Sequence, residues 1–260
     1  MPMLPYPPLE MRELVGPIDL AAFDNPSGAL VYPDLPPESF DSVFDFGCGC
    51  GRVARQLIQQ RPSPKRYVGV DLHLGMVRWC EHNLRPIAPH FKFVHHDVFS
   101  VNFNPGNKPT FAPFPVADHD FTLVNAHSVF THLTEEQALL YLRECARILR
   151  PDGILRSSWF LFDKSDFPML QEFNNALYVS HVHPTDAVLF ARSWVVSCAR
   201  ELGLVLFAIA PPAVRGHQWV LLMTPARDGV REIEFPEDLA PKGLVRSPLG
   251  PAEPARVGLD

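Results

Sequence analysis

The segment FDFGCGCGRVARQL, residues 44–57, places three glycines at every second position between an apolar run and a helical pattern. These glycines are Gly47, Gly49 and Gly51. A glycine lacks the Cβ atom that would keep a ligand away from the backbone, and it adopts the positive φ angles that a tight turn requires. A strand, a glycine turn and a helix in this order predict an α/β fold with a cofactor pocket above the turn.

The rest of the chain supports this fold class, because strand and helix patterns alternate from residue 41 to residue 162. Alternation of this kind predicts a Rossmann-like, seven-stranded, mostly parallel sheet with helices on both faces and an antiparallel hairpin at its C-terminal edge. Thr134 and Gln137 have the spacing of a capping box at the start of one helix. We expect strands at 41–46, 66–71, 91–97, 120–126, 154–162, 205–212 and 217–224, and helices at 51–60, 75–84, 134–149 and 193–204.

Prolines mark the segments that lie outside this alternation. The chain has 28 prolines, and they gather in the N-terminal region, in the stretch NPGNKPTFAPFP and near the C-terminus. Because proline cannot donate a hydrogen bond to a helix or a sheet, we expect irregular structure there. The expected organisation is a lid at 1–40, a main domain at 41–224 with a substrate-cap insertion at 159–190, and an irregular tail at 225–260.

Charge and composition exclude several classes of function. The formal net charge of −6 disfavours a general nucleic-acid binder. No apolar run reaches the length of a membrane span and the N-terminus lacks the apolar core of a signal peptide, so we expect a cytoplasmic protein. The five cysteines show no CxxC spacing, and adjacent residues in the run His95, His96, Asp97 point to opposite faces of a strand. We therefore expect no disulfide framework and no metal.

The spacing around the glycines bears on the identity of the cofactor. Dinucleotide-binding turns have the pattern G-x-G-x-x-G, whereas this chain has G-x-G-x-G preceded by Asp45. Asp71 ends the second expected strand, where a carboxylate can accept two hydrogen bonds from a vicinal diol. The number of residues between Gly51 and Asp71 also occurs between the glycine turn and the acid in NAD enzymes. An NAD-linked oxidoreductase is therefore an alternative. The glycine spacing and the lack of a Tyr-x-x-x-Lys pair disfavour it.

From about residue 41 to residue 160 the chain resembles the class I S-adenosylmethionine-dependent methyltransferases of the bacterial small-molecule type. The motif DFGCGCG, the acid at Asp71, the acid at Asp97 and the stretch FTLVNAHSVFTHLTEEQALLYLRECARILRPDGIL carry this resemblance. It implies that Asp71 holds the ribose hydroxyls and that Asp97 faces the adenine amine. The cofactor residues that it implies are Asp45, Gly47, Cys48, Gly49, Gly51, Arg52, Asp71, Leu72, Met76, Asp97, Val98, Asn125 and Ala126.

The resemblance also implies a reaction, with S-adenosylhomocysteine as the product of the cofactor. An oxygen acceptor needs a general base, and His127 and His132 follow the fourth expected strand, although His132 could also pack against or cap the next helix. We expect methyl transfer to a small hydroxylated acceptor, such as a sugar, a glycan or a natural product, which Asp163, Asn174 and His183 of the insertion would suit. The alternatives are N- or C-methylation and a catalytically silent protein that binds S-adenosylmethionine and serves a partner. We expect a monomer or a homodimer that binds no nucleic acid.

Overall fold

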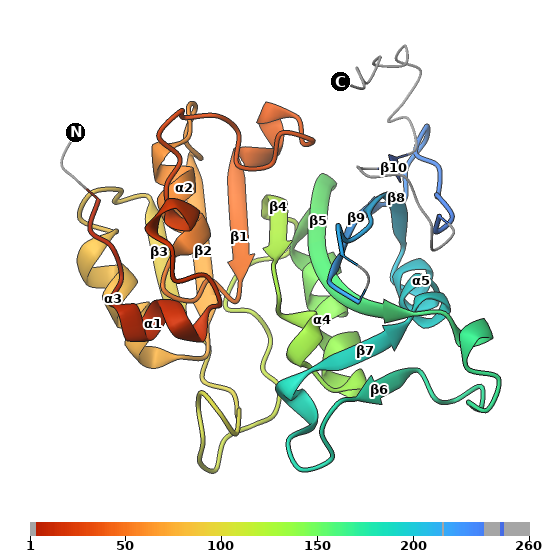
Figure 1. Cartoon of the computed structure of the whole chain (residues 1–260). Helices are drawn as coiled ribbons and strands as arrows, with labels where there is room; N and C mark the ends of the chain where they lie inside the picture. Colours follow the sequence, from red (N-terminus) through yellow and green to blue (C-terminus); the bar gives the residue numbers. More distant parts are fainter. Residues whose placement is uncertain (1–3, 215, 237–244, 247–260) are drawn as a thin grey trace.

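The computed structural model describes residues 4–214, 216–236 and 245–246, and it is built around one mixed β-sheet (Figure 1). Within these residues the main strand order is β10-β8-β9-β5-β4-β1-β2-β3, and β6 and β7 extend the sheet from β5. The strands are β1 (Ser42–Phe46), β2 (Arg66–Asp71), β3 (Phe91–His95), β4 (Phe121–Ala126), β5 (Leu149–Phe162), β6 (Ala176–Tyr178), β7 (Val188–Ala191), β8 (Leu204–Ala210), β9 (Trp219–Pro225) and β10 (Val245–Arg246).

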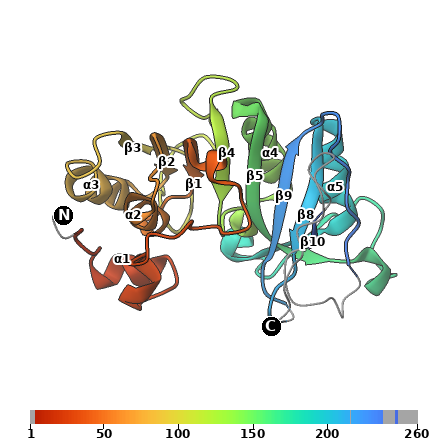
Figure 2. The same cartoon turned by 90° about the horizontal axis from the view of Figure 1, so that it is seen from above.

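Helices cover both faces of the sheet (Figure 2). Because successive side chains of a strand point to opposite faces, Phe44 and Phe46 of β1 belong to the core cluster that includes residues of α4 and α5, whereas Val43 belongs to the cluster that includes residues of α2 and α3. Among the helices of the described residues, none is long and apolar enough to cross a membrane. The helices are α1 (Leu9–Leu14), α2 (Arg52–Gln59), α3 (Leu74–Asn83), α4 (Glu135–Ile148) and α5 (Arg192–Glu201), with the short helices η1 (Leu20–Phe23), η2 (Pro37–Phe40), η3 (Phe130–His132), η4 (Lys164–Asp166) and η5 (Pro184–Asp186).

The strand directions confirm the predicted fold class. Strands β3, β2, β1, β4 and β5 run parallel to one another, whereas β9 is antiparallel to both β5 and β8. The capping box is also confirmed, because the Thr134 side chain accepts from the Gln137 backbone N–H and the Gln137 side chain accepts from that of Thr134. The structure differs from expectation at the sheet edge, where Val245–Arg246 of the tail pairs with β8.

The insertion after β5 also contains strands that the sequence did not predict. Strand β7 pairs in parallel with the end of β5, and β6 pairs antiparallel with β7. These strands are short and the segment contains Pro168 and Pro184, so no clear alternation marks them. They carry the insertion past the carboxyl end of β5, toward the lower edge of the molecule in Figure 1.

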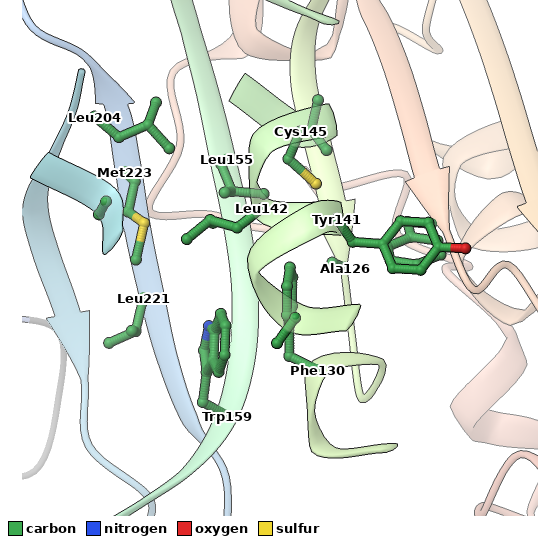
Figure 3. Packing of buried hydrophobic residues seen from close by; sticks show 14 of the residues in the cluster. Ala126, Phe130, Tyr141, Leu142, Cys145, Leu155, Trp159, Leu204, Leu221 and Met223 are labelled. Atoms are coloured by element: carbon green, nitrogen blue, oxygen red, sulfur yellow. The ribbon is translucent and has the colours of Figure 1, made fainter. Parts of the chain in front are cut away.

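Trp159 fixes the base of this insertion to the core (Figure 3). Its ring is fully buried and stacks on Phe130 of η3 with ring centroids 4.1 Å apart. The edge of Phe190 from β7 meets the same ring at 5.3 Å, and the indole N–H donates to the Ser157 hydroxyl. The contacts hold η3 and the insertion at a defined place beside the carboxyl ends of β4 and β5.

Candidate functional site

A cavity of about 700 Å³ lies at the carboxyl ends of β1, β2 and β4. In a parallel sheet these strand ends meet at one edge, which brings together residues that are far apart in sequence. The glycine turn after β1 and the residues after β2 and β4 form its floor. Leu14 and Val15 of the N-terminal segment and Val182 of the insertion add walls from outside the sheet.

The glycine turn has a backbone that only glycine adopts easily. Gly47, Gly49 and Gly51 have φ angles of 77°, 52° and 80°. A Cβ atom at Gly47 would collide with the side chain of Val129, and one at Gly49 would lie 2.8 Å from Val15 Cγ1. The turn is therefore closely packed by other residues, and its backbone faces the cavity without side chains.

Asp71 joins the glycine turn to the end of β2. Its Oδ2 accepts the backbone N–H of Gly49 at 2.8 Å, and its Oδ1 accepts that of His73 at 2.8 Å. Burial raises the pKa of the Asp71 carboxyl, and the two N–H donors partly oppose this rise. A carboxylate has about four acceptor positions, so Asp71 keeps acceptor capacity toward the cavity that it lines.

Asp45 is the centre of a buried hydrogen-bond network beneath the turn. Its Oδ2 accepts the hydroxyl of Tyr67 at 2.7 Å, and its Oδ1 accepts the amide N–H of Asn125 at 2.7 Å. The Tyr32 hydroxyl in turn donates to Asn125 Oδ1 at 3.0 Å. Burial raises the pKa of Asp45 to about 6, although the bonds from Tyr67 and Asn125 favour its charged form. The network ties the last residues of β1 and β4 and the start of β2 to Tyr32 of the N-terminal segment.

This raised pKa predicts a pH dependence of stability. The folded protein holds a proton on Asp45 more tightly than the unfolded chain, so the contribution of Asp45 is greatest at low pH and is lost as the pH rises through about 6. From about pH 4 to about pH 6, the unfolding free energy of the wild type should fall relative to that of Asp45→Asn by up to about 3 kcal/mol. Urea unfolding of both proteins across this range measures the difference. A constant difference would contradict the prediction.

Most of the predicted cofactor residues come together in this cavity. Gly51, Asn125 and Ala126 do not line it: a Cβ at Gly51 would meet Leu84 of the α3 region at 2.7 Å, Asn125 bonds to Asp45, and Ala126 lies in the core. The predicted residues that line the cavity are Asp45, Gly47, Cys48, Gly49, Arg52, Asp71, Leu72, Met76 and Val98, together with His127 and His132.

Asp97 lies outside the cavity lining. Its side chain is 59% exposed, forms an ion pair with Lys108 and accepts the amide N–H of Asn104 at 3.0 Å. The hydrogen bonds from Lys108 and Asn104 lower the pKa of Asp97. Its expected contact with adenine therefore remains a prediction, and in this structure Lys108 holds the carboxylate.

The two candidate histidines differ in their surroundings. Burial lowers the pKa of His127 to about 4, and the positive charges of Arg52 and Arg156 lower it further, so its ring is neutral at neutral pH. His132 is exposed at the cavity, and its Nδ1 lies 3.1 Å from the carbonyl oxygen of Thr185 in η5. A carbonyl can only accept, so Nδ1 carries the hydrogen and Nε2 of the neutral ring carries the free lone pair.

A polar cluster that the sequence did not reveal supports this part of the cavity. Ser128 has a positive φ of 59°, a conformation that costs energy for a residue other than glycine. Its N–H donates to the Ser158 hydroxyl at 2.6 Å, and its own hydroxyl accepts from the Gln218 amide at 2.8 Å. Ser158 also donates to Gln218 at 2.6 Å. The cluster fixes the backbone directly after His127.

His96 and Tyr141 form a second polar pair at the cavity that sequence reasoning did not select. Their Nε2 and hydroxyl oxygen lie 2.8 Å apart, and both residues line the cavity. Burial lowers the pKa of His96 to about 4 and raises that of Tyr141. Both groups are therefore uncharged at neutral pH. Within the described residues, no group of three or more His, Cys, Asp or Glu residues is arranged to hold a metal ion.

Comparisons with known proteins agree with this geometry. Residues 43–153 match the family model described as a methyltransferase domain. The chain is 28% identical over 152 residues to the demethylmenaquinone methyltransferase of Porphyromonas gingivalis, which covers 58% of this chain and 55% of the relative. It is 26% identical over 136 residues to a malonyl-acyl-carrier-protein O-methyltransferase of the same species, over 52% of this chain and 44% of the relative. The chain thus spans about half the length of these curated relatives.

Solved structures show the same fold. An O-methyltransferase from neocarzinostatin biosynthesis, solved with S-adenosylmethionine, matches with a TM-score of 0.51 at 14% identity, over 74% of this chain and 51% of that one. The cyclase SpnF matches with a TM-score of 0.51 at 15% identity, over 72% and 76% of the two chains. These likenesses confirm the predicted fold class.

Proposed function

We propose that the protein is a class I, S-adenosylmethionine-dependent methyltransferase and that it methylates a small hydroxylated acceptor, a proposal supported by the match of residues 43–153 to the methyltransferase domain model. One observation carries the proposal: the glycine turn, Asp71 and two histidines line the same cavity. The glycine turn and Asp71 can bind a cofactor, and the histidines can accept a proton from the hydroxyl of an acceptor or hydrogen-bond to it. O-methylation of a natural product fits these groups, and N- or C-methylation is the second candidate within the class.

The residues of the cavity fit S-adenosylmethionine. The cofactor supplies an electrophilic methyl group on a sulfonium cation when bound. The turn at Gly47 and Gly49 lines the cavity, and Asp71 has acceptor capacity left for the ribose hydroxyls. Met76 and Val98 provide apolar surface beside it. A pyrophosphate would instead face the carboxylates of Asp45 and Asp71, which argues against a dinucleotide.

His132 is the better of the two candidate bases. A general base needs a free lone pair and a partner that orients its ring, and the bond to the Thr185 carbonyl gives His132 both. His127, with a pKa of about 4, is a weak base and is suited to hold the acceptor hydroxyl as a neutral hydrogen-bond partner. In this proposal His132 Nε2 would take the proton from the acceptor hydroxyl, and the cofactor, when bound, would supply the methyl group and leave as S-adenosylhomocysteine.

Calorimetric titration with S-adenosylhomocysteine tests the cofactor assignment, with NAD as the parallel ligand. We expect S-adenosylhomocysteine to bind with a dissociation constant on the order of micromolar and NAD to give no heat of binding. The physical reason is that the carboxylates of Asp45 and Asp71 can attract the α-ammonium group of S-adenosylhomocysteine, whereas they would repel the pyrophosphate of NAD. Binding of NAD alone would mean that the glycine turn serves a different cofactor and would overturn the proposal.

A further inference from the structure

The charges of the cavity are confined to one end. Among the described residues that line it, the Asp, Glu, Lys and Arg residues are Asp45, Arg52 and Asp71, and all three belong to the glycine turn or to strand ends. Burial keeps His96 and His127 neutral, since each has a pKa of about 4. The walls formed by the lining residues within 98–103, 127–141 and 182–185 include no Asp, Glu, Lys or Arg, and the histidines among them besides His127 are His132 and His183. A charged group placed against these walls would lose its hydration without gaining a counter-charge.

Beside these walls, the outer rim of the cavity exposes three large apolar side chains to solvent. Val101, Phe103 and Val182 line the cavity with 41%, 40% and 81% of their surface exposed. A hydrogen bond of 2.9 Å from Asn102 to Asp186 joins the loop after β3 to the segment between β6 and β7 (Figure 1). Large apolar side chains that gather around a cavity mouth indicate a surface that a ligand covers.

We propose that the acceptor is an uncharged, hydroxylated ring with an apolar substituent. The ring hydroxyl lies beside His127 and His132, and the substituent extends along Val101, Phe103 and Val182. This inference rests on the proposed function, because it names the class of acceptor at the same site. Of the three insertion residues expected to suit a hydroxylated acceptor, His183 lines the cavity, whereas Asp163 and Asn174 lie outside its lining and bond to Ser165 and Gln171, so a sugar would find few polar partners there.

Calorimetric titration with phenol, para-propylphenol and para-pentylphenol tests the substituent site, without cofactor and again with saturating S-adenosylhomocysteine. Each CH₂ group that enters the apolar rim should raise the affinity about threefold. A chain that ends in a carboxylate, as in para-hydroxyphenyl-pentanoate, should bind at least about tenfold more weakly than para-pentylphenol. Affinities that do not depend on chain length would overturn the proposal.

Variants of the rim residues test where the alkyl chain of the phenol binds. Phe103→Ser and Val182→Ser should each remove most of the gain from the pentyl group and leave phenol binding unchanged. Phe173→Ser is the matched control, because Phe173 is 72% exposed and lies outside the cavity lining. If the increase in affinity from phenol to para-pentylphenol were undiminished in both Phe103→Ser and Val182→Ser, the alkyl chain would bind elsewhere and the inference would be overturned. Chain-dependent binding of the phenols without binding of S-adenosylhomocysteine would support the apolar site and overturn the proposed function.

Discussion

Replacement of Asp71 by alanine should weaken the binding of S-adenosylhomocysteine by roughly a hundredfold, since two hydrogen bonds to a charged acceptor would be lost. The same change removes the acceptor for the N–H groups of Gly49 and His73, which hold the glycine turn in place. Asp71→Asn keeps the size of the side chain and one acceptor oxygen, so it should lose less affinity. Calorimetric titration of both variants measures the effect, and circular dichroism checks that they fold.

Asp97→Ala is the matched control for Asp71. Asp71 ends β2 and Asp97 follows β3, but the Asp97 side chain is 59% exposed and pairs with Lys108 rather than lining the cavity. We expect Asp97→Ala to lose less affinity than Asp71→Ala, because the Asp97 carboxylate is exposed and already held by Lys108 and Asn104. Wild-type affinity in Asp71→Ala would show that the cofactor binds elsewhere. An equal loss in both variants would contradict the distinction that the structure makes between them.

His132→Ala should lower kcat by about a hundredfold or more and leave the affinity for S-adenosylhomocysteine nearly unchanged. The reason is that His132 supplies the free Nε2 lone pair at the acceptor end of the cavity, apart from the glycine turn. Steady-state rates on a phenol that the protein methylates measure the effect. Because His132 is exposed, free imidazole should restore part of the activity of the variant.

His127→Asn provides the comparison for His132. The asparagine amide can still hydrogen-bond an acceptor hydroxyl, so this variant should lose less activity than His132→Ala, and imidazole should not improve it. Unchanged turnover in His132→Ala would remove His132 from the reaction. A larger loss in His127→Asn than in His132→Ala would assign the base to His127 instead.

Local patterns in the sequence were sufficient to predict most of the fold. The helix predicted at 134–149 is observed as Glu135–Ile148, since its start is encoded by the Thr134 capping box. The strand predicted at 66–71 is observed with the same bounds. The strands at 176–178 and 245–246 were not predicted, because they are short and exist through pairing with distant strands.

The site was predicted where a local motif marks it and missed where partners come from distant segments. The glycine turn and Asp71 carry such a motif, and both lie at the cavity. The cluster around Ser128 is different, because Ser158 and Gln218 lie 30 and 90 residues away along the chain. The pairing of Asp97 with Lys108 likewise depends on how a proline-rich loop folds back, which no periodic pattern encodes.

The position of β9 in the sheet has a consequence for the order of folding during synthesis. Strand β9 lies between β5 and β8, although it follows both in the chain. Until Pro225 has left the ribosome, β5 and β8 therefore have no strand to join them, and each presents unpaired backbone groups. Such edges favour association between nascent chains. Truncation before Trp219 would leave both edges open permanently, so aggregation rather than loss of activity would be the first sign of an incomplete chain.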